Sequence, residues 1–512
     1  MAKIKQRERV AIIQSLSAGV VPKVGLEHIQ VGRKDEINAI ISDLGIISNN
    51  GSTIRFIVGR YGSGKSFFLN LCRLVALQKK FVVTQADITL EKRLYSTDGQ
   101  ARALYTELVH NFATRSKPEG GALSAIIQQW ISDIDYRLRQ EGKSNEEIIA
   151  QMHKELLPLQ ELVSGFDFAL VLRKYFEGFI SGNDILMNSA IRWLSGEYTT
   201  KTEARQDLGV RTIISDDNVY NYLKLWAKFV RLAGYSGLLV NLDEMGVLSH
   251  RLNNAQSRNN NYEKILTIVN DCLQGNVQDI GFIFAGVDDF MYDRRRGLAS
   301  YEALERRLIR DTFKVEGLKD FSGPVIHLDN LSIEDTVVLL RNIRNVFAYN
   351  DPEKYLIPDE GIAGYLNHCA KTLGADFYLT PGDVVKGYVR LLSVMEQNPG
   401  TSWESIIKNT TIEKTEPAEV TKEIEKPEKK DFLEYQLTPI EKEVVKALES
   451  NIGRNVFGSR LRMIYIGKKK GFDKSFVSAF FGGLKQFNDF NLNGFKPNDA
   501  SKTYANYLLT DT

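Results

Sequence analysis

The residues best suited to chemistry lie in the stretch GRYGSGKS, Gly59 to Ser66, which satisfies the phosphate-binding pattern G-x-x-x-x-G-K-[ST]. Its glycines allow backbone dihedral angles that other residues rarely adopt, so successive N–H groups can turn inward around a phosphate. Lys65 would reach the β- and γ-phosphates of a nucleotide, and the Ser66 hydroxyl would bind Mg²⁺. We expect the following residues to contact the nucleotide: Gly59, Arg60, Tyr61, Gly62, Ser63, Gly64, Lys65 and Ser66.

A carboxylate pair ends the apolar run in GLLVNLDEM, residues 237–245. At the tip of a strand, Asp243 is placed to bind Mg²⁺ directly or through water. Glu244 is placed to act as the general base that orients the attacking water. An apolar run followed by Asp-Glu is common, so this interpretation depends on the glycine-rich loop. The pair favours the P-loop ATPases that have an additional strand over GTPases, and the chain has no N-K-x-D guanine motif.

Charge on the γ-phosphate usually needs a further cation, which is often an arginine from a neighbouring subunit. Arginines further along the chain are candidates for this role. The segment 300–313 carries Arg306, Arg307 and Arg310, and the run YDRRRG at 292–297 is a competing source. The alternative for each of these arginines is a solvated surface charge.

The elements that position these residues follow from the periodicity of apolar side chains. Short apolar runs predict five strands, at 53–58, 81–87, 237–242, 281–286 and 324–328. Apolar spacing predicts a helix before the first strand and another between the first two strands, and the strand–helix–strand series is typical of a βαβ unit of a parallel sheet. Helical patterns at 101–112, 122–138, 145–163 and 219–234 predict a long insertion between the second and third strands.

Composition and pattern divide the chain into several regions. A Ser-x-x-Asp capping pattern at Ser332 opens a helical region, and a charged, proline-containing stretch with few large apolar residues predicts a solvated linker. We expect an N-terminal basic helix and entry segment at 1–50, a P-loop core at 51–330 with its insertion at about 100–230, a helical lid at 331–400, a linker at 411–431 and a small domain at 432–512.

The overall composition is that of a soluble globular protein, with 43% hydrophobic and 25% charged residues. The 66 Lys and Arg residues nearly balance the 64 Asp and Glu residues, so a nucleic-acid or membrane partner can be argued only from local charge. No apolar run approaches the length of a membrane span, and the three cysteines lack the spacing of a metal site. We expect a cytoplasmic protein with reduced thiols and no membrane partner.

Positive charge gathers near the C-terminus. Between 435 and 512 there are 12 Lys and Arg residues and 7 Asp and Glu residues. The residues that would contact nucleic-acid phosphates are Arg460, Arg462, Lys468, Lys469 and Lys470, with aromatic residues among them. The region also resembles a winged-helix module, weakly similar to the LOTUS or OST-HTH type that binds RNA. DNA and RNA both remain open as ligands, and a protein-docking or structural role is the alternative.

Several motifs, taken in order, resemble those of the P-loop ATP-binding proteins of BREX-type and related bacterial phage-defence islands. The resemblance covers roughly residues 7–400 and extends well beyond the phosphate-binding loop. The motifs are VGLEHIQVGRKDEI, GRYGSGKSF, GQARALYTELV, WLSGEYTTKTEAR, AGYSGLLVNLDEM and FIFAGVDDF.

The resemblance implies an α/β fold, namely the three-layer αβα domain of AAA+ ATPases of the origin-recognition and Cdc6-like branch. It implies ATP and Mg²⁺ as cofactors, a helicase-like or other defence-system protein as partner, and action on foreign DNA. A homo-oligomer is compatible with an arginine supplied by a neighbouring subunit. The resemblance maps Val31, Gly32 and Arg33 to the box that packs near adenine, and it favours Arg307 over Arg306.

Two departures from the family pattern bear on hydrolysis. Gly382 stands where relatives commonly have a lid arginine, with Lys386 one turn later as a substitute, and Val287 and Asp288 stand where a polar sensor residue is expected. These residues make slow hydrolysis, or binding with little turnover, credible. We expect an ATPase of antiphage defence. The alternatives are a nucleotide-switched scaffold or signalling protein, and a replication-initiation-like or clamp-loader-like ATPase.

Overall fold

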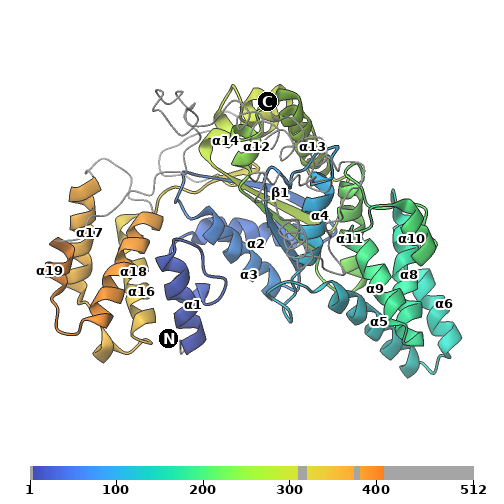
Figure 1. Cartoon of the computed structure of the whole chain (residues 1–512), viewed down its shortest axis with the longest axis horizontal. Helices are drawn as coiled ribbons and strands as arrows, with labels where there is room; N and C mark the ends of the chain where they lie inside the picture. Colours follow the sequence, from blue (N-terminus) through green and yellow to red (C-terminus); the bar gives the residue numbers. More distant parts are fainter. Residues whose placement is uncertain (1–3, 310–319, 374–380, 409–512) are drawn as a thin grey trace, which may run out of the picture. The chain divides into compact units, whose positions relative to one another are not determined.

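A five-stranded parallel sheet organises the core of the protein (Figure 1). The computed structural model describes residues 4–309, 320–373 and 381–408. The strands are β1 (Ser52–Val58), β2 (Val82–Asp87), β3 (Leu238–Asp243), β4 (Ile280–Gly286) and β5 (Val325–His327). All five expected strands are present, and their order is β2-β3-β4-β1-β5. In this order β4 lies between β1, which leads into the glycine-rich loop, and β3, which ends at Asp243.

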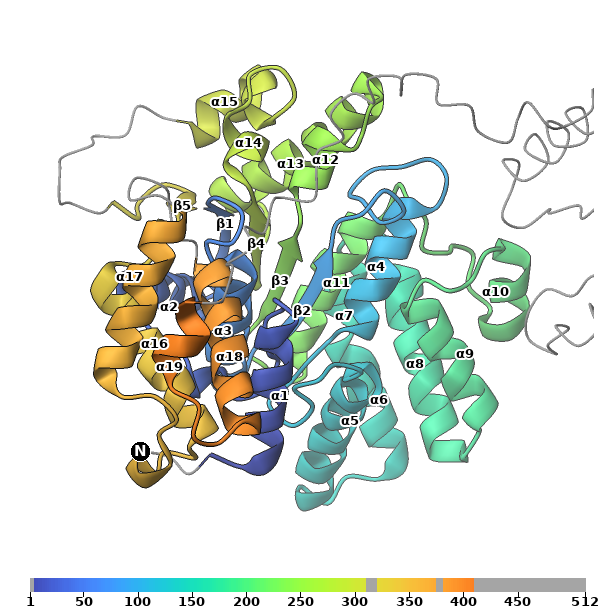
Figure 2. The same ribbon diagram turned by 60° about the vertical axis from the view of Figure 1, so that its left-hand side comes forward.

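Helices cover both faces of the sheet, so its strands are apolar on both sides (Figure 2). All residues of β3 and β4 are buried. Two helices pack on one face, α2 (Lys34–Ser48) and α3 (Lys65–Gln78). The other face is covered by α4 (Gln100–His110), α11 (Val219–Leu232) and α13 (Ala255–Leu273). The expected α/β fold is confirmed.

The segment between β2 and β3 is helical, as the sequence predicts. Between α4 and α11 it contains α5 (Leu123–Gln140), α6 (Asn145–Glu155), α7 (Leu157–Gln160), α8 (Gly165–Ser181), α9 (Asp184–Leu194) and α10 (Lys201–Leu208). The stretch 145–163 is largely helical, as expected, but the chain breaks between α6 and α7. Pro158 lies in the first turn of α7, where its missing N–H is tolerated, and it cannot continue α6.

Within the described residues, four helices follow β5 and have an apolar core of their own. They are α16 (Ile333–Phe347), α17 (Asp359–Leu373), α18 (Pro381–Gln397) and α19 (Trp403–Lys408). Ser332 caps α16 as expected, since its hydroxyl accepts a hydrogen bond from the Asp335 N–H at 3.0 Å. The N-terminal helix α1 (Gln6–Ser17) joins this core, and Arg9 Nε donates to the Phe347 carbonyl at 3.1 Å. The segment expected to form one entry unit thus divides between two cores, because α1 packs with the helices that follow β5 and α2 packs on the sheet.

Shorter helices complete the described chain. They are α12 (Gly246–His250), α14 (Asp288–Tyr292) and α15 (Glu302–Leu308), with 3-10 turns at Leu26–His28, Leu298–Ser300 and Pro352–Lys354. Within the described ranges, no helix combines the length and apolarity needed to cross a membrane. The linker at 411–431, the region 432–512 with its winged-helix resemblance, and the five basic residues between 460 and 470 lie outside the described residues.

Candidate nucleotide-binding site

Residues Gly59 to Gly64 form the turn between β1 and α3, at the carboxyl edge of the sheet, and Lys65 and Ser66 begin α3. Gly62 and Gly64 have φ angles of +77° and +91°, in the left-handed region that favours glycine. A Cβ atom at Gly59 would lie 2.7 Å from Ser63 Oγ and 2.8 Å from the Leu328 carbonyl oxygen, so no larger side chain fits without a shift. The first N–H groups of α3 have no partner within the helix and are available to an anion.

Lys65, the first residue of α3, folds back over the loop. Its Nζ donates to the carbonyl oxygens of Gly59 at 2.9 Å and Arg60 at 2.8 Å. Burial lowers the pKa of Lys65, while the negative charges of Asp243, Glu244 and Asp288 act in the opposite direction. The ammonium group is therefore held at the mouth of the loop, within the field of the carboxylates across the sheet edge.

Ser66 and Asp243 meet at the same edge. Ser66 Oγ donates to Asp243 Oδ2 at 2.6 Å and so joins the start of α3 to the tip of β3. Asp243 is buried, and its Oδ1 accepts a hydrogen bond from the Glu244 N–H at 2.8 Å. A hydroxyl and a carboxylate are the hard oxygen ligands that Mg²⁺ prefers. The two residues expected to bind Mg²⁺ are thus brought together.

Glu244 follows Asp243 in a strained conformation. Its φ is +56°, in the left-handed region that non-glycine residues rarely adopt and that often marks functional sites. The side chain is exposed, yet loss of surrounding water, followed by the charges of Asp243 and Asp87, raises the pKa of its carboxyl group. The backbone turn places this carboxylate next along the chain from the Ser66–Asp243 pair, and its role as a general base stays a prediction.

Asp87, at the end of β2, belongs to the same edge but was missed by the sequence analysis. It is the register partner of Asp243. Desolvation and then the charge of Asp243 raise the pKa of Asp87, while Lys92 and Lys23 lower it. A sequence pattern does point to Asp87, because VVTQAD begins with apolar residues and ends in an aspartate, as LLVNLD does.

The segment Val31–Gly32–Arg33 contacts both the loop and the helices that follow β5. Gly32 and Arg33 have φ angles of +65° and +59°. Arg33 Nη2 donates to the Ser63 carbonyl at 3.3 Å and to the Asp329 carbonyl, and burial lowers the pKa of the guanidinium. Val31 packs against the core of the lid helices. These three residues therefore lie beside the loop, and their contact with adenine remains a prediction.

The start of α18 also reaches the loop. The Gly382 N–H donates to the Gly62 carbonyl at 3.4 Å, so this position contributes a backbone contact and no side-chain charge. Lys386, the expected substitute, is exposed one turn later, and its Cδ lies 3.7 Å from the ideal Cβ position of Gly19. It therefore lies beside the chain that leaves α1.

The candidate arginines differ in how they are held. Arg307 is half-buried, and it donates to Asn270 Oδ1 at 2.6 Å and to the Ala303 carbonyl at 2.7 Å. Arg306 is exposed and pairs with Glu302 on the same helix. Within the competing run, Arg296 donates to the His250 carbonyl at 3.1 Å. Arg310 lies outside the described residues.

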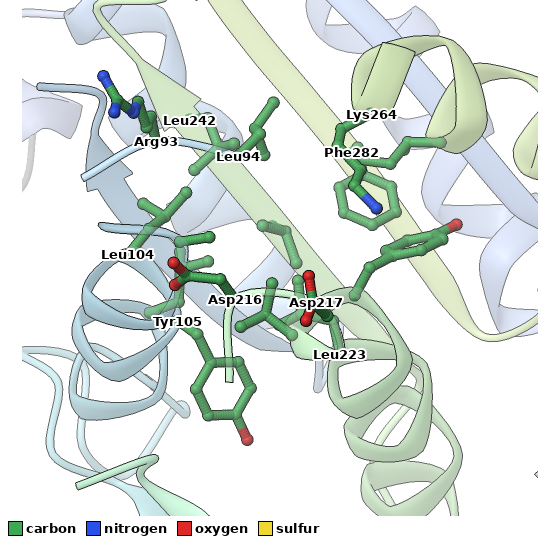
Figure 3. Close-up of a pocket in the computed structure, with 16 residues that line it drawn as sticks. Arg93, Leu94, Leu104, Tyr105, Asp216, Asp217, Leu223, Leu242, Lys264 and Phe282 are labelled. Carbon is green, nitrogen blue, oxygen red and sulfur yellow. The ribbon is translucent and has the colours of Figure 1, made fainter. Parts of the chain in front are cut away.

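A narrow apolar pocket lies on the opposite face of the sheet from α3 (Figure 3). Apolar side chains of β3, β4, α4 and α11 line it, including Leu242 and Phe282, and Arg93, Asp216 and Lys264 stand at its polar edge. It contains no residue of the phosphate-binding loop. The expected site is instead an open edge built from loop and strand ends.

The residues present at this edge fit a magnesium nucleotide. The glycine cradle leaves no room for a Cβ atom at Gly59, and the buried Ser63 Oγ has no hydrogen-bond partner among the described residues. Arg60 and Tyr61 are exposed on the outer side of the loop. The parallel sheet, the loop and the Ser66–Asp243 pair define a P-loop nucleotide-binding protein.

Comparison with known proteins gives the family. The family model described as BREX system ATP-binding protein BrxC/D matches residues 4–411, so the chain belongs to this family. The resemblance drawn from the sequence motifs is confirmed. No curated protein matched the chain. The protein is therefore an ATP-binding component of a BREX phage-defence system.

Proposed function

We propose that the protein is an AAA+ ATPase that hydrolyses ATP at the carboxyl edge of its sheet. The observation that carries this proposal is the 2.6 Å hydrogen bond between Ser66 and Asp243, with Glu244 next along the chain. The strand order, with β4 between β1 and β3, and the separate helical lid support the AAA+ architecture.

Each residue has a distinct role in the proposed reaction. Magnesium ATP supplies the phosphoryl group when it is bound. Lys65 leaves its carbonyl partners for the β- and γ-phosphates, and Ser66 and Asp243 hold the cation. Glu244 orients the water that attacks the γ-phosphate and takes up its proton. Arg33 fixes the loop by holding the Ser63 carbonyl beside the entry of the lid helices.

The test is phosphate release by the full chain at saturating magnesium ATP. Glu244→Gln should lower turnover about 100-fold or more, because it removes the general base, while ATP binding persists. Glu263→Gln is the matched control, since Glu263 is an exposed carboxylate on α13. Equal turnover in Glu244→Gln and wild type would remove this carboxylate from the mechanism.

A nucleotide-switched scaffold is the second candidate, and two observations favour it. Gly382 offers only its backbone N–H to the loop, and Arg307 is held by Asn270 and Ala303 within its own chain. Neither position presents a free cation to the γ-phosphate. A switch would bind ATP and release almost no phosphate, and Glu244→Gln would then leave this low rate unchanged.

The proposed partners rest on the family and on the C-terminal sequence. A BREX component acts with other defence-system proteins, and we propose a helicase-like protein among them. We also propose that the basic residues at 460–470 contact nucleic acid. Replacing Lys468, Lys469 and Lys470 with alanine should weaken binding to duplex DNA or to RNA and reduce its salt dependence. Unchanged affinity for both would exclude this contact.

A further inference from the structure

Two polar pairs lie side by side on β2 and β3, directly below the proposed nucleotide site. In the parallel register Gln85 is opposite Asn241, and Asp87 is opposite Asp243. Alternate residues of a strand face the same side of a sheet, so all four side chains lie on one face. The bond from Ser66 to Asp243 identifies it as the face covered by α3.

The deeper pair has unsatisfied hydrogen-bonding groups. Asn241 is completely buried, and neither its Nδ2 nor its Oδ1 has a partner among the described residues. Gln85 Oε1 is likewise buried and without a partner in this part of the chain. Each such group costs about 1–3 kcal/mol unless something satisfies it. Buried polar side chains of this kind are commonly satisfied by ordered water, which makes two to four hydrogen bonds.

The upper pair is a concentration of negative charge. The Asp87 side chain makes no hydrogen bond or ion pair with any residue that the structure describes, and the Asp87 backbone lies one strand spacing, about 4.8 Å, from that of Asp243. No three carboxylate, histidine or cysteine groups among the described residues are close enough to ligate a metal ion directly. The contact that we infer from Asp87 to a cation at Ser66 and Asp243 is one that passes through water. Mg²⁺ suits such an arrangement because it usually retains several waters.

We propose that Asp87 is a third carboxylate of the nucleotide site, which binds the water shell of the magnesium ion, and that Gln85 and Asn241 hold the ordered water beneath it. This inference rests on the proposed binding of magnesium nucleotide at the loop. Asp87 and Asn241 are then positioning residues.

The test compares the binding of a fluorescent ATP analogue to the full chain in EDTA and across a titration of MgCl₂. Asp87→Asn should raise the Mg²⁺ concentration needed for half-maximal binding about tenfold, as outer-shell changes do at other metal sites. Its affinity in EDTA should be unchanged or higher, because a negative charge near the triphosphate is removed. Asp289→Asn is the control, since Asp289 is an exposed carboxylate after β4 at the same edge.

Asn241→Leu tests the water beneath the site. It preserves the approximate shape of the side chain and removes the unsatisfied groups, so the thermal unfolding temperature should stay the same or rise. A purely structural asparagine would leave the Mg²⁺ dependence of binding unchanged, whereas our inference predicts that more Mg²⁺ is needed. Wild-type Mg²⁺ dependence in Asp87→Asn would overturn the role of Asp87, and in Asn241→Leu it would overturn the role of the water. Failure of the wild type to bind nucleotide at all would overturn the proposed function and this inference with it.

Discussion

Gly59→Ala is expected to damage the nucleotide site through a single added methyl group. The new Cβ would lie 2.7 Å from Ser63 Oγ and 2.8 Å from the Leu328 carbonyl oxygen. The serine hydroxyl can rotate, but the carbonyl belongs to the backbone that follows β5, so the loop and strand must separate. Overpacking of this kind costs about 1–3 kcal/mol. If the cost falls on the loop conformation that binds phosphate, ATP affinity should decrease roughly 5- to 150-fold.

Gly45→Ala is the matched control for this substitution. Gly45 lies within α2, and a Cβ atom there would meet nothing within 4 Å. Alanine is the better helix former, so this change should stabilise the protein by roughly 0.5–1 kcal/mol and leave ATP affinity unchanged. The assays are thermal unfolding with and without magnesium ATP and equilibrium binding of a fluorescent ATP analogue. Wild-type affinity in Gly59→Ala would refute the assignment of Gly59 to a closed phosphate cradle.

Two further predictions concern the core. Asp43 accepts hydrogen bonds from Arg55 Nε and Nη2 at 2.6 and 2.8 Å, and both side chains are nearly buried, so Asp43→Asn should destabilise the protein by about 3–5 kcal/mol in urea unfolding. The exposed ion pair of Asp135 with Arg139 provides the control, since Asp135→Asn should change stability little. Equal losses of stability in Asp43→Asn and Asp135→Asn would contradict the argument from burial. Burial raises the pKa of every cysteine thiol, to about 12 at Cys272 and about 11 at Cys369, with Cys72 raised further still. The native protein should therefore resist thiol-specific labelling at pH 8, and its stability should fall as pH rises above the unfolded thiol value near 8.5, because the unfolded chain then loses protons that the native thiols retain. Rapid labelling of the native chain would contradict this burial.

The local pattern of the sequence predicts the sheet well. Short apolar runs such as TIRFIV and GFIFAG are typical of strands in an α/β protein, because strands of a parallel sheet are buried on both faces. The break at Pro158 and the separate helices α8, α9 and α10 were harder to predict, because a stretch with helical periodicity does not by itself fix where each helix ends.

The nucleotide site likewise has one part that the local sequence predicts and another that depends on the fold. The loop and the Asp243–Glu244 pair are contiguous in sequence and are predictable from residue type and order. The role of Asp87 depends on strand order and register, which bring β2 beside β3 across more than 150 residues. The pairing of Arg307 with Asn270 and the packing of α1 with the lid helices are likewise long-range contacts that no local pattern encodes.

Equilibrium binding of ATP to wild type, Lys65→Ala and Lys79→Ala tests the central claim most directly. Lys65 begins α3 at the loop, and Lys79 is exposed at the other end of the same helix, so the two substitutions remove the same charge from opposite ends. Binding should be lost, or weakened more than tenfold, in Lys65→Ala and should match wild type in Lys79→Ala. Wild-type affinity in Lys65→Ala would show that the nucleotide binds elsewhere in the chain.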